Sequence, residues 1–195
     1  MVSDVKKITG ETLKIVSVKP QNQPFVYIQT IQGIQEETYR IQTRKNTLAI
    51  TGSNEMGTVF GIYHFKENFL GIDPIFFWND RRPKKQSVLA FKNINIQSQK
   101  PTFKYRGWFI NDEDLLTEWQ ENSGKRNIDY PFYQQITSPE VIKKVCETAL
   151  RLRFNLIIPA SFIDIRNPSE AALIQEANKR GLYVSMHHVE PMGVS

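Results

Sequence analysis

The sequence has a single cysteine among its 195 residues, and that scarcity excludes two kinds of site. One thiol cannot form a disulfide within the chain, and it cannot supply the ligands of a cysteine-based metal site. Cys146 follows apolar residues with helical spacing (Val141, Ile142, Val145), which indicates a buried structural thiol. Long apolar runs are also missing, since no stretch approaches the ~20 residues of a membrane-spanning helix.

Motifs for phosphate, nucleotide or metal binding are absent as well. The glycines at positions 52, 57 and 61 are too loosely spaced for a phosphate loop, and there is no dinucleotide fingerprint. The three histidines show no known zinc spacing. We therefore expect no metal and no cofactor. The first seven residues lack the apolar segment of a signal peptide, so none is expected in this chain.

The charge of the chain is basic but dispersed. The net charge of +5 could suggest a nucleic acid or another anionic polymer as a partner. However, the densest basic cluster, residues 81–85, lies in a proline-containing segment that is typical of a solvated turn. No RNA- or DNA-binding motif accompanies it. We therefore expect neither a nucleic-acid partner nor a membrane partner.

Residues 1–100 have the pattern of a small α/β accessory domain. A helix is predicted after the polar residues 52–55, with apolar side chains at helical spacing and Gly71 as the residue that ends it. Alternating apolar and polar residues predict four strands in front of this helix, at residues 13–18, 25–30, 38–43 and 47–51. An aromatic stretch and a further strand pair, at 87–92 and 94–97, precede the boundary near Pro101.

Residues 101–195 change to an alternation of strands and helices. Ser138 followed by Pro139 is a strong helix start, and a second helix begins at Asn167. Three apolar strands are predicted, at 105–110, 154–159 and 182–186, with a polar insert at 117–137. This order is typical of a parallel sheet, and we expect the first three strands of a truncated (β/α)8 TIM-type barrel.

Functional groups of such a barrel follow the carboxyl ends of its strands. Asn111, Asp112 and Glu113 follow the first predicted strand, and Ser161 and Asp164 follow the second. Glycoside hydrolysis uses a pair of carboxylates, so Asp112 and Glu113 are candidate catalytic residues and Asn111 is a candidate sugar ligand. The alternative is that these side chains only solvate the loop or cap the next segment.

His187, His188 and Glu190 follow the third predicted strand. Neighbouring imidazoles can bind a sugar hydroxyl or carboxylate, although one histidine could instead pack in the barrel while the other faces solvent. Trp78 is a candidate sugar-stacking residue, because aromatic faces suit the apolar faces of pyranoses. For the aromatic stretch around Trp78, packing between domains is the alternative.

Three segments resemble glycoside hydrolase family 115, the xylan α-1,2-glucuronidases. Residues 52–63 (Gly-Ser-Asn-Glu-Met-Gly-Thr-Val-Phe-Gly-Ile-Tyr) are similar to the family segment that precedes the barrel. Residues 103–113, which end in Asn-Asp-Glu, resemble its first barrel strand, and residues 187–192 (His-His-Val-Glu-Pro-Met) resemble its histidine-containing loop. Helices like the one in the first segment also precede the barrel in family 67 glucuronidases and hexosaminidase-like enzymes.

The resemblance implies a glycoside hydrolase that removes glucuronic acid or a related sugar from a plant-type polysaccharide such as glucuronoxylan, with inversion. It implies that Asp112 is an active-site carboxylate, that His187 or His188 contacts the uronic acid, and that the parent protein is secreted or periplasmic. The acid and base pair would lie on later strands, so we expect this chain alone to be inactive. The alternative is a non-catalytic carbohydrate-binding or interaction module. The sequence leaves open whether the protein forms a homodimer.

Overall fold

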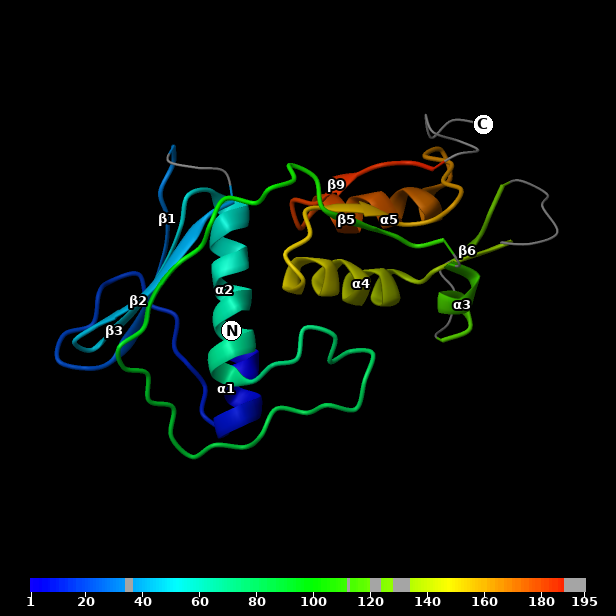
Figure 1. Ribbon diagram of the computed structural model, residues 1–195. Helices are drawn as coiled ribbons and strands as arrows, with labels where there is room; N and C mark the ends of the chain where they lie inside the picture. The colour runs from blue at the N-terminus through cyan, green and yellow to red at the C-terminus, as the bar shows by residue number, and fades with distance from the viewer. Residues whose placement is uncertain (34–36, 112, 120–123, 128–133, 188–195) are drawn as a thin grey trace. The chain divides into compact units, whose positions relative to one another are not determined.

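The structure is a computed structural model that describes the chain except for residues 34–36, 112, 120–123, 128–133 and 188–195. It divides into two compact units, residues 1–102 and residues 103–195 (Figure 1). In the described part of the chain, no helix is long and apolar enough to cross a membrane.

The first unit is built on a four-stranded mixed sheet. Strands β2 (Tyr39–Arg44) and β3 (Thr47–Gly52) form an antiparallel hairpin. Strand β1 (Phe25–Thr30) pairs in parallel with β3, and β4 (Asn95–Gln97) pairs antiparallel with β2, which gives the order β1-β3-β2-β4. The sequence predicted these four strands to within one residue at each end.

Helix α2 (Glu55–Leu70) packs against this sheet, as Figure 1 shows. The Asn54 side chain accepts a hydrogen bond from the Gly57 amide at 2.7 Å and caps the helix, which ends at Gly71 in the left-handed conformation. Gly61 allows close approach, because a Cβ there would lie 3.0 Å from Ile50. The helix start and stop signals of the sequence are therefore confirmed.

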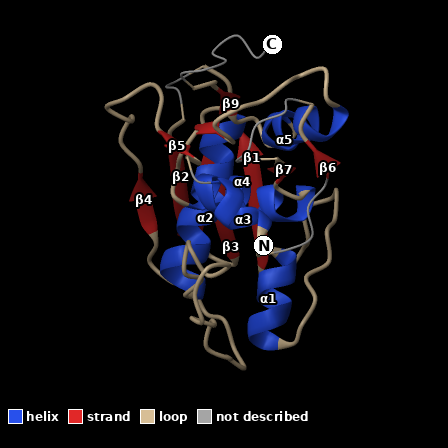
Figure 2. Ribbon diagram, turned by 90° about the vertical axis from the view of Figure 1, so that its right-hand side faces the viewer, coloured by secondary structure: helices blue, strands red, loops and turns tan. Residues whose placement is uncertain are grey.

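Two predicted strands of this unit are wrong, and one helix was missed. Residues 13–18 and 87–92 contain no strand and belong to the long loops drawn in tan in Figure 2. Ile15 and Val18 are 88% and 80% exposed, so the alternation at 13–18 buries no apolar face. Helix α1 (Val2–Thr9) is held by a buried ion pair of 2.7 Å between Asp4 and Lys66 of α2.

The second unit contains a three-stranded parallel sheet. Strands β5 (Gly107–Phe109), β8 (Leu156–Ile158) and β9 (Tyr183–Val184) lie in the order β5-β8-β9. Helices α4 (Pro139–Arg151) and α5 (Pro168–Asn178) precede β8 and β9, as the sequence predicted. The mixed α/β class is thus confirmed, while a barrel that these strands would open stays a prediction.

The core of this unit is the apolar side of α4 packed with α5 and β8. Ile142, Cys146 and Ile157 have no exposed surface. At the amino ends of the strands, the buried Asn155 side chain accepts a hydrogen bond from the Arg106 amide at 2.9 Å and donates one to the Lys104 carbonyl at 2.8 Å. These two bonds hold the segment before β5 next to the segment before β8.

The insert between β5 and α4 has regular structure that the sequence did not indicate. Helix α3 (Glu113–Thr117) is followed by the antiparallel pair β6 (Gly124–Lys125) and β7 (Gln135–Ile136). A polar composition without periodicity predicted only an insert. The reason for the difference is that the two strands are too short to show an alternating pattern.

Candidate functional site

The carboxyl ends of β5, β8 and β9 lie at one edge of the parallel sheet, where α/β proteins commonly bind ligands. Two of these ends are joined directly. The Ser161 hydroxyl, three residues after β8, donates a hydrogen bond of 2.9 Å to the Asn111 carbonyl, two residues after β5. Ser161 is buried and Asn111 is exposed. The second strand end therefore fixes the backbone at the start of the Asn-Asp-Glu segment.

The third strand end meets the first through an aromatic contact. The His187 ring, three residues after β9, lies against the ring of Phe109 with a centroid distance of 4.1 Å and an angle of 34°. Phe109 is the last residue of β5 and stands two residues before Asn111. The structure thus places the backbone of Asn111 and the His187 ring at the same edge of the sheet.

Other predicted site residues are not placed in this way. Asp112, His188 and Glu190 lie outside the described residues. Glu113 is the first residue of α3. The catalytic role of Asp112 and Glu113 and the substrate-binding role of His188 and Glu190 therefore stay predictions.

Trp78 lies in the first unit, in the segment that follows α2. Its amide donates a hydrogen bond of 2.9 Å to the Ile75 carbonyl, and its side chain is half-buried. The neighbouring rings of Phe76 and Phe77 contact each other with centroids 4.2 Å apart. A sugar-stacking role for Trp78 stays a prediction.

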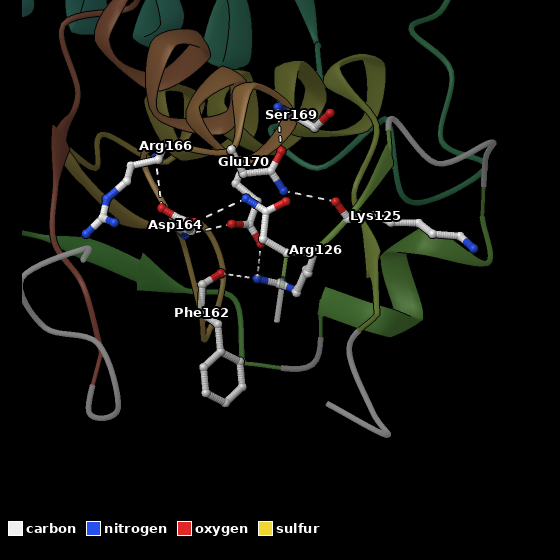
Figure 3. Close-up of polar contacts among 9 residues, drawn as sticks. Lys125, Arg126, Phe162, Asp164, Arg166, Ser169 and Glu170 are labelled. Atoms are coloured by element: carbon white, nitrogen blue, oxygen red, sulfur yellow. Dashed lines mark hydrogen bonds and ion pairs between the residues drawn. The ribbon is translucent and has the colours of Figure 1, made fainter. Parts of the chain in front are cut away.

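A buried ion pair that the sequence analysis missed lies behind the loop after β8 (Figure 3). Arg126 Nη1 lies 2.8 Å from Glu170 Oε1 and also donates a hydrogen bond to the Phe162 carbonyl. The two side chains are only 1% and 2% exposed. Glu170 Oε2 accepts a hydrogen bond of 2.6 Å from the Asp164 amide. In the sequence, Glu170 has the position of an ordinary acidic residue in a first helical turn, and nothing marks Arg126.

The two carboxyl groups of this loop have opposite pKa shifts. Burial raises the pKa of Glu170 above its usual value, although the Asp164 amide and the Arg126 guanidinium oppose the shift. The backbone N–H of Arg166 and the side-chain amide of Asn127 lower the pKa of Asp164. Asp164 is therefore ionised at neutral pH and can accept hydrogen bonds from ligand hydroxyls. At the edge of the sheet, the Asn111 amide and the His187 imidazole are groups that can bind hydroxyl and carboxylate ligands.

Comparison with known proteins identifies the family. The model of glycosyl hydrolase family 115 matches residues 98–195, which is half of the chain and includes all three strand ends. The chain belongs to this family. A search of the curated proteins finds no significant match.

Solved structures show a shared fold. The chain resembles the family GH115 4-O-methyl-α-glucuronidase BtGH115A, described as specific for decorated arabinogalactans, with a TM-score of 0.76 and 23% identity over 98% of this chain and 26% of that one. It also resembles the N-acetyl-β-hexosaminidase of Streptomyces plicatus, with a TM-score of 0.61 and 11% identity over 95% of this chain and 37% of that one. The chain therefore spans about a quarter of its family 115 neighbour.

Proposed function

We propose that the protein containing this chain is a glycoside hydrolase that removes glucuronic acid, or a related sugar, from a plant-type polysaccharide by an inverting reaction. Membership of family 115 carries this proposal, because the matched residues 98–195 include the Asn-Asp-Glu segment and the histidine segment. The α-glucuronidase activity named for BtGH115A supports the same reaction class. Glucuronoxylan and decorated arabinogalactan are the substrates to test first.

The second unit is, in this proposal, the start of a (β/α)8 catalytic barrel, and residues 1–100 form an accessory α/β domain. The parallel order β5-β8-β9, with a helix before each later strand, supports this assignment. The likeness to longer glycoside hydrolases over nearly the whole chain supports it as well. Because a barrel needs eight strands, the 195-residue chain alone is expected to be inactive, and export is expected for the parent protein.

Each candidate residue has a role in the proposed reaction. Asp112 and Glu113 supply carboxylates at the end of β5, and Asn111 binds a sugar hydroxyl. His187 or His188 binds the uronate, since a charged imidazolium and a carboxylate form a strong charge-assisted hydrogen bond. Additional sugar contacts are assigned to Glu190 and Trp78.

The test uses the full-length protein with glucuronoxylan and with a glucuronic-acid-decorated arabinogalactan. Chromatography should detect a free uronic acid, and NMR of the first product should show the β-anomer if the reaction inverts. The substitution Asp112→Asn should reduce this release by at least about 100-fold, because it removes a reacting charge while keeping the side-chain shape. Absence of release from every uronic-acid-decorated glycan would contradict the proposal. Tight glycan binding without release would instead support a carbohydrate-binding module.

A further inference from the structure

The Arg126–Glu170 pair connects parts of the second unit that are 44 positions apart in the sequence. Transferring two charges into a protein interior is costly unless hydrogen bonds satisfy both groups. Both Glu170 oxygens are used here, one by Arg126 and one by the Asp164 amide. The pair therefore fixes the positions of the backbone segments that it contacts. Apolar side chains of similar volume would fill the same space but would not fix these positions.

On one side, the pair holds the β6–β7 hairpin. Arg126 directly follows β6, and its backbone N–H donates a hydrogen bond of 3.0 Å to the Gln134 carbonyl, which precedes β7. The Asn167 side chain adds a second attachment, because it donates a hydrogen bond of 2.9 Å to the Lys125 carbonyl. Figure 3 shows the contacts of Arg126 with Glu170 and Phe162, and it labels Lys125, whose carbonyl accepts the Asn167 bond.

On the other side, the pair holds the loop after β8, at residues 159–167. Arg126 binds the Phe162 carbonyl, and Glu170 binds the Asp164 amide, so two alternate residues of the loop are fixed. Ser161, next to Phe162, donates its hydroxyl to the Asn111 carbonyl. A continuous series of contacts thus runs from the buried pair to the segment that carries the proposed active-site carboxylates.

We propose that Arg126 and Glu170 are positioning residues for the site at the carboxyl end of the sheet. The pair fixes the loop at 159–167, and that loop holds the Asn111 backbone through Ser161. This inference rests on the proposed function, since it assigns the catalytic segment to residues 111–113. A displacement of a reacting group by about 1 Å can reduce a rate by about 100-fold, so a pair remote from substrate can strongly affect turnover.

The experiment compares three variants of the full-length protein with a matched control. Arg126→Met removes the charge, Glu170→Gln keeps the shape of the partner, and Arg126→Lys keeps the charge. The control is Arg151→Met. Arg151 is also buried, at 3% exposure, and its Nη2 lies 2.6 Å from Glu147, but this ion pair lies within α4. Kinetics with a uronic-acid-decorated glycan and the melting temperature are measured for each.

Arg126→Met and Glu170→Gln should lower kcat by about 10- to 100-fold while changing KM less than about threefold. Arg151→Met should lower the melting temperature by less, because its partner Glu147 is 32% exposed and keeps contact with water, and it should leave kcat within about twofold. Arg126→Lys should recover most of the lost kcat, because one nitrogen, Nη1, makes the contacts with both Glu170 and Phe162. If Arg126→Met and Arg151→Met lower kcat alike, the pair is merely structural and the inference is wrong.

A second measurement separates this inference from the proposed function. Hydrogen exchange of the full-length variants needs no substrate. Arg126→Lys and Glu170→Gln are the milder changes, and both should raise exchange at residues 107–111 and 159–167 relative to the wild type. The increase should be larger for Glu170→Gln than for Arg126→Lys, and exchange in α4 should not change. Wild-type protein that is inactive on all such glycans would remove the proposed reaction and leave this readout intact. Unchanged exchange in both segments would overturn the positioning role.

Discussion

At the scale of single residues, two buried polar groups of the second unit bind partners that are distant in the sequence. Asn155 contacts the backbone at Lys104 and Arg106, and Arg126 contacts Glu170. Such partners satisfy groups that would each cost about 1–3 kcal/mol if buried without a hydrogen bond. A sequence pattern shows which residues are polar, but it does not show which of them the fold brings together.

Cys146 gives a prediction at the same scale. Burial raises the pKa of its thiol from 9.0 to about 11, so the folded state binds this proton more tightly than the unfolded state. The contribution to stability is present below pH 9 and is lost as the pH rises through 11. The free energy of unfolding of the wild type, relative to Cys146→Ala, should therefore fall by about 2–3 kcal/mol over this range. Urea titrations of both proteins at pH 8 and pH 11 measure this difference, and a constant difference would contradict the prediction.

At the scale of elements, cap residues located helices α2, α4 and α5, whereas α1 and α3 were missed. Ser138 and Asn167 accept hydrogen bonds from the first turns of α4 and α5, as their sequence positions indicated. Alternation located β1, β2 and β3, but it also predicted a strand at residues 13–18, where none forms. The backbone groups of a strand need hydrogen-bond partners on a neighbouring strand, whereas most backbone groups of a capped helix are paired within the helix.

The contact between β3 and α2 gives a prediction for this scale. A Cβ at Gly52 would lie 2.1 Å from the backbone nitrogen of Thr58, which must then move. Gly52→Ala should therefore lower the free energy of unfolding by at least about 2 kcal/mol, measured by urea denaturation. Gln29→Ala, an exposed position on the neighbouring strand, should change it by less than about 0.5 kcal/mol.

A double substitution tests the reason for this loss. Thr58→Ala removes the hydroxyl but leaves the backbone nitrogen in place, so it should not restore stability to Gly52→Ala. Recovery in the double variant would show that the conflict lies with the side chain of Thr58 and that our account of this contact is wrong.

At the scale of the whole molecule, the sequence predicted the parallel β/α series whose strand ends carry Asn111 and His187. Parallel strands separated by helices place their carboxyl ends together, so strand order alone was sufficient for that edge. The supporting contacts of Ser161 and Arg126 were not predictable. They depend on how the insert folds back against the loop after β8, and no periodic pattern in the insert records that arrangement.

The buried pair also has a consequence for how the family can diverge. A substitution of Arg126 alone leaves the Glu170 charge buried without its main partner, which typically costs about 3–5 kcal/mol. Descendant sequences should rarely retain one of the two residues without the other. In an alignment of orthologous sequences, substitutions at positions 126 and 170 should therefore occur together.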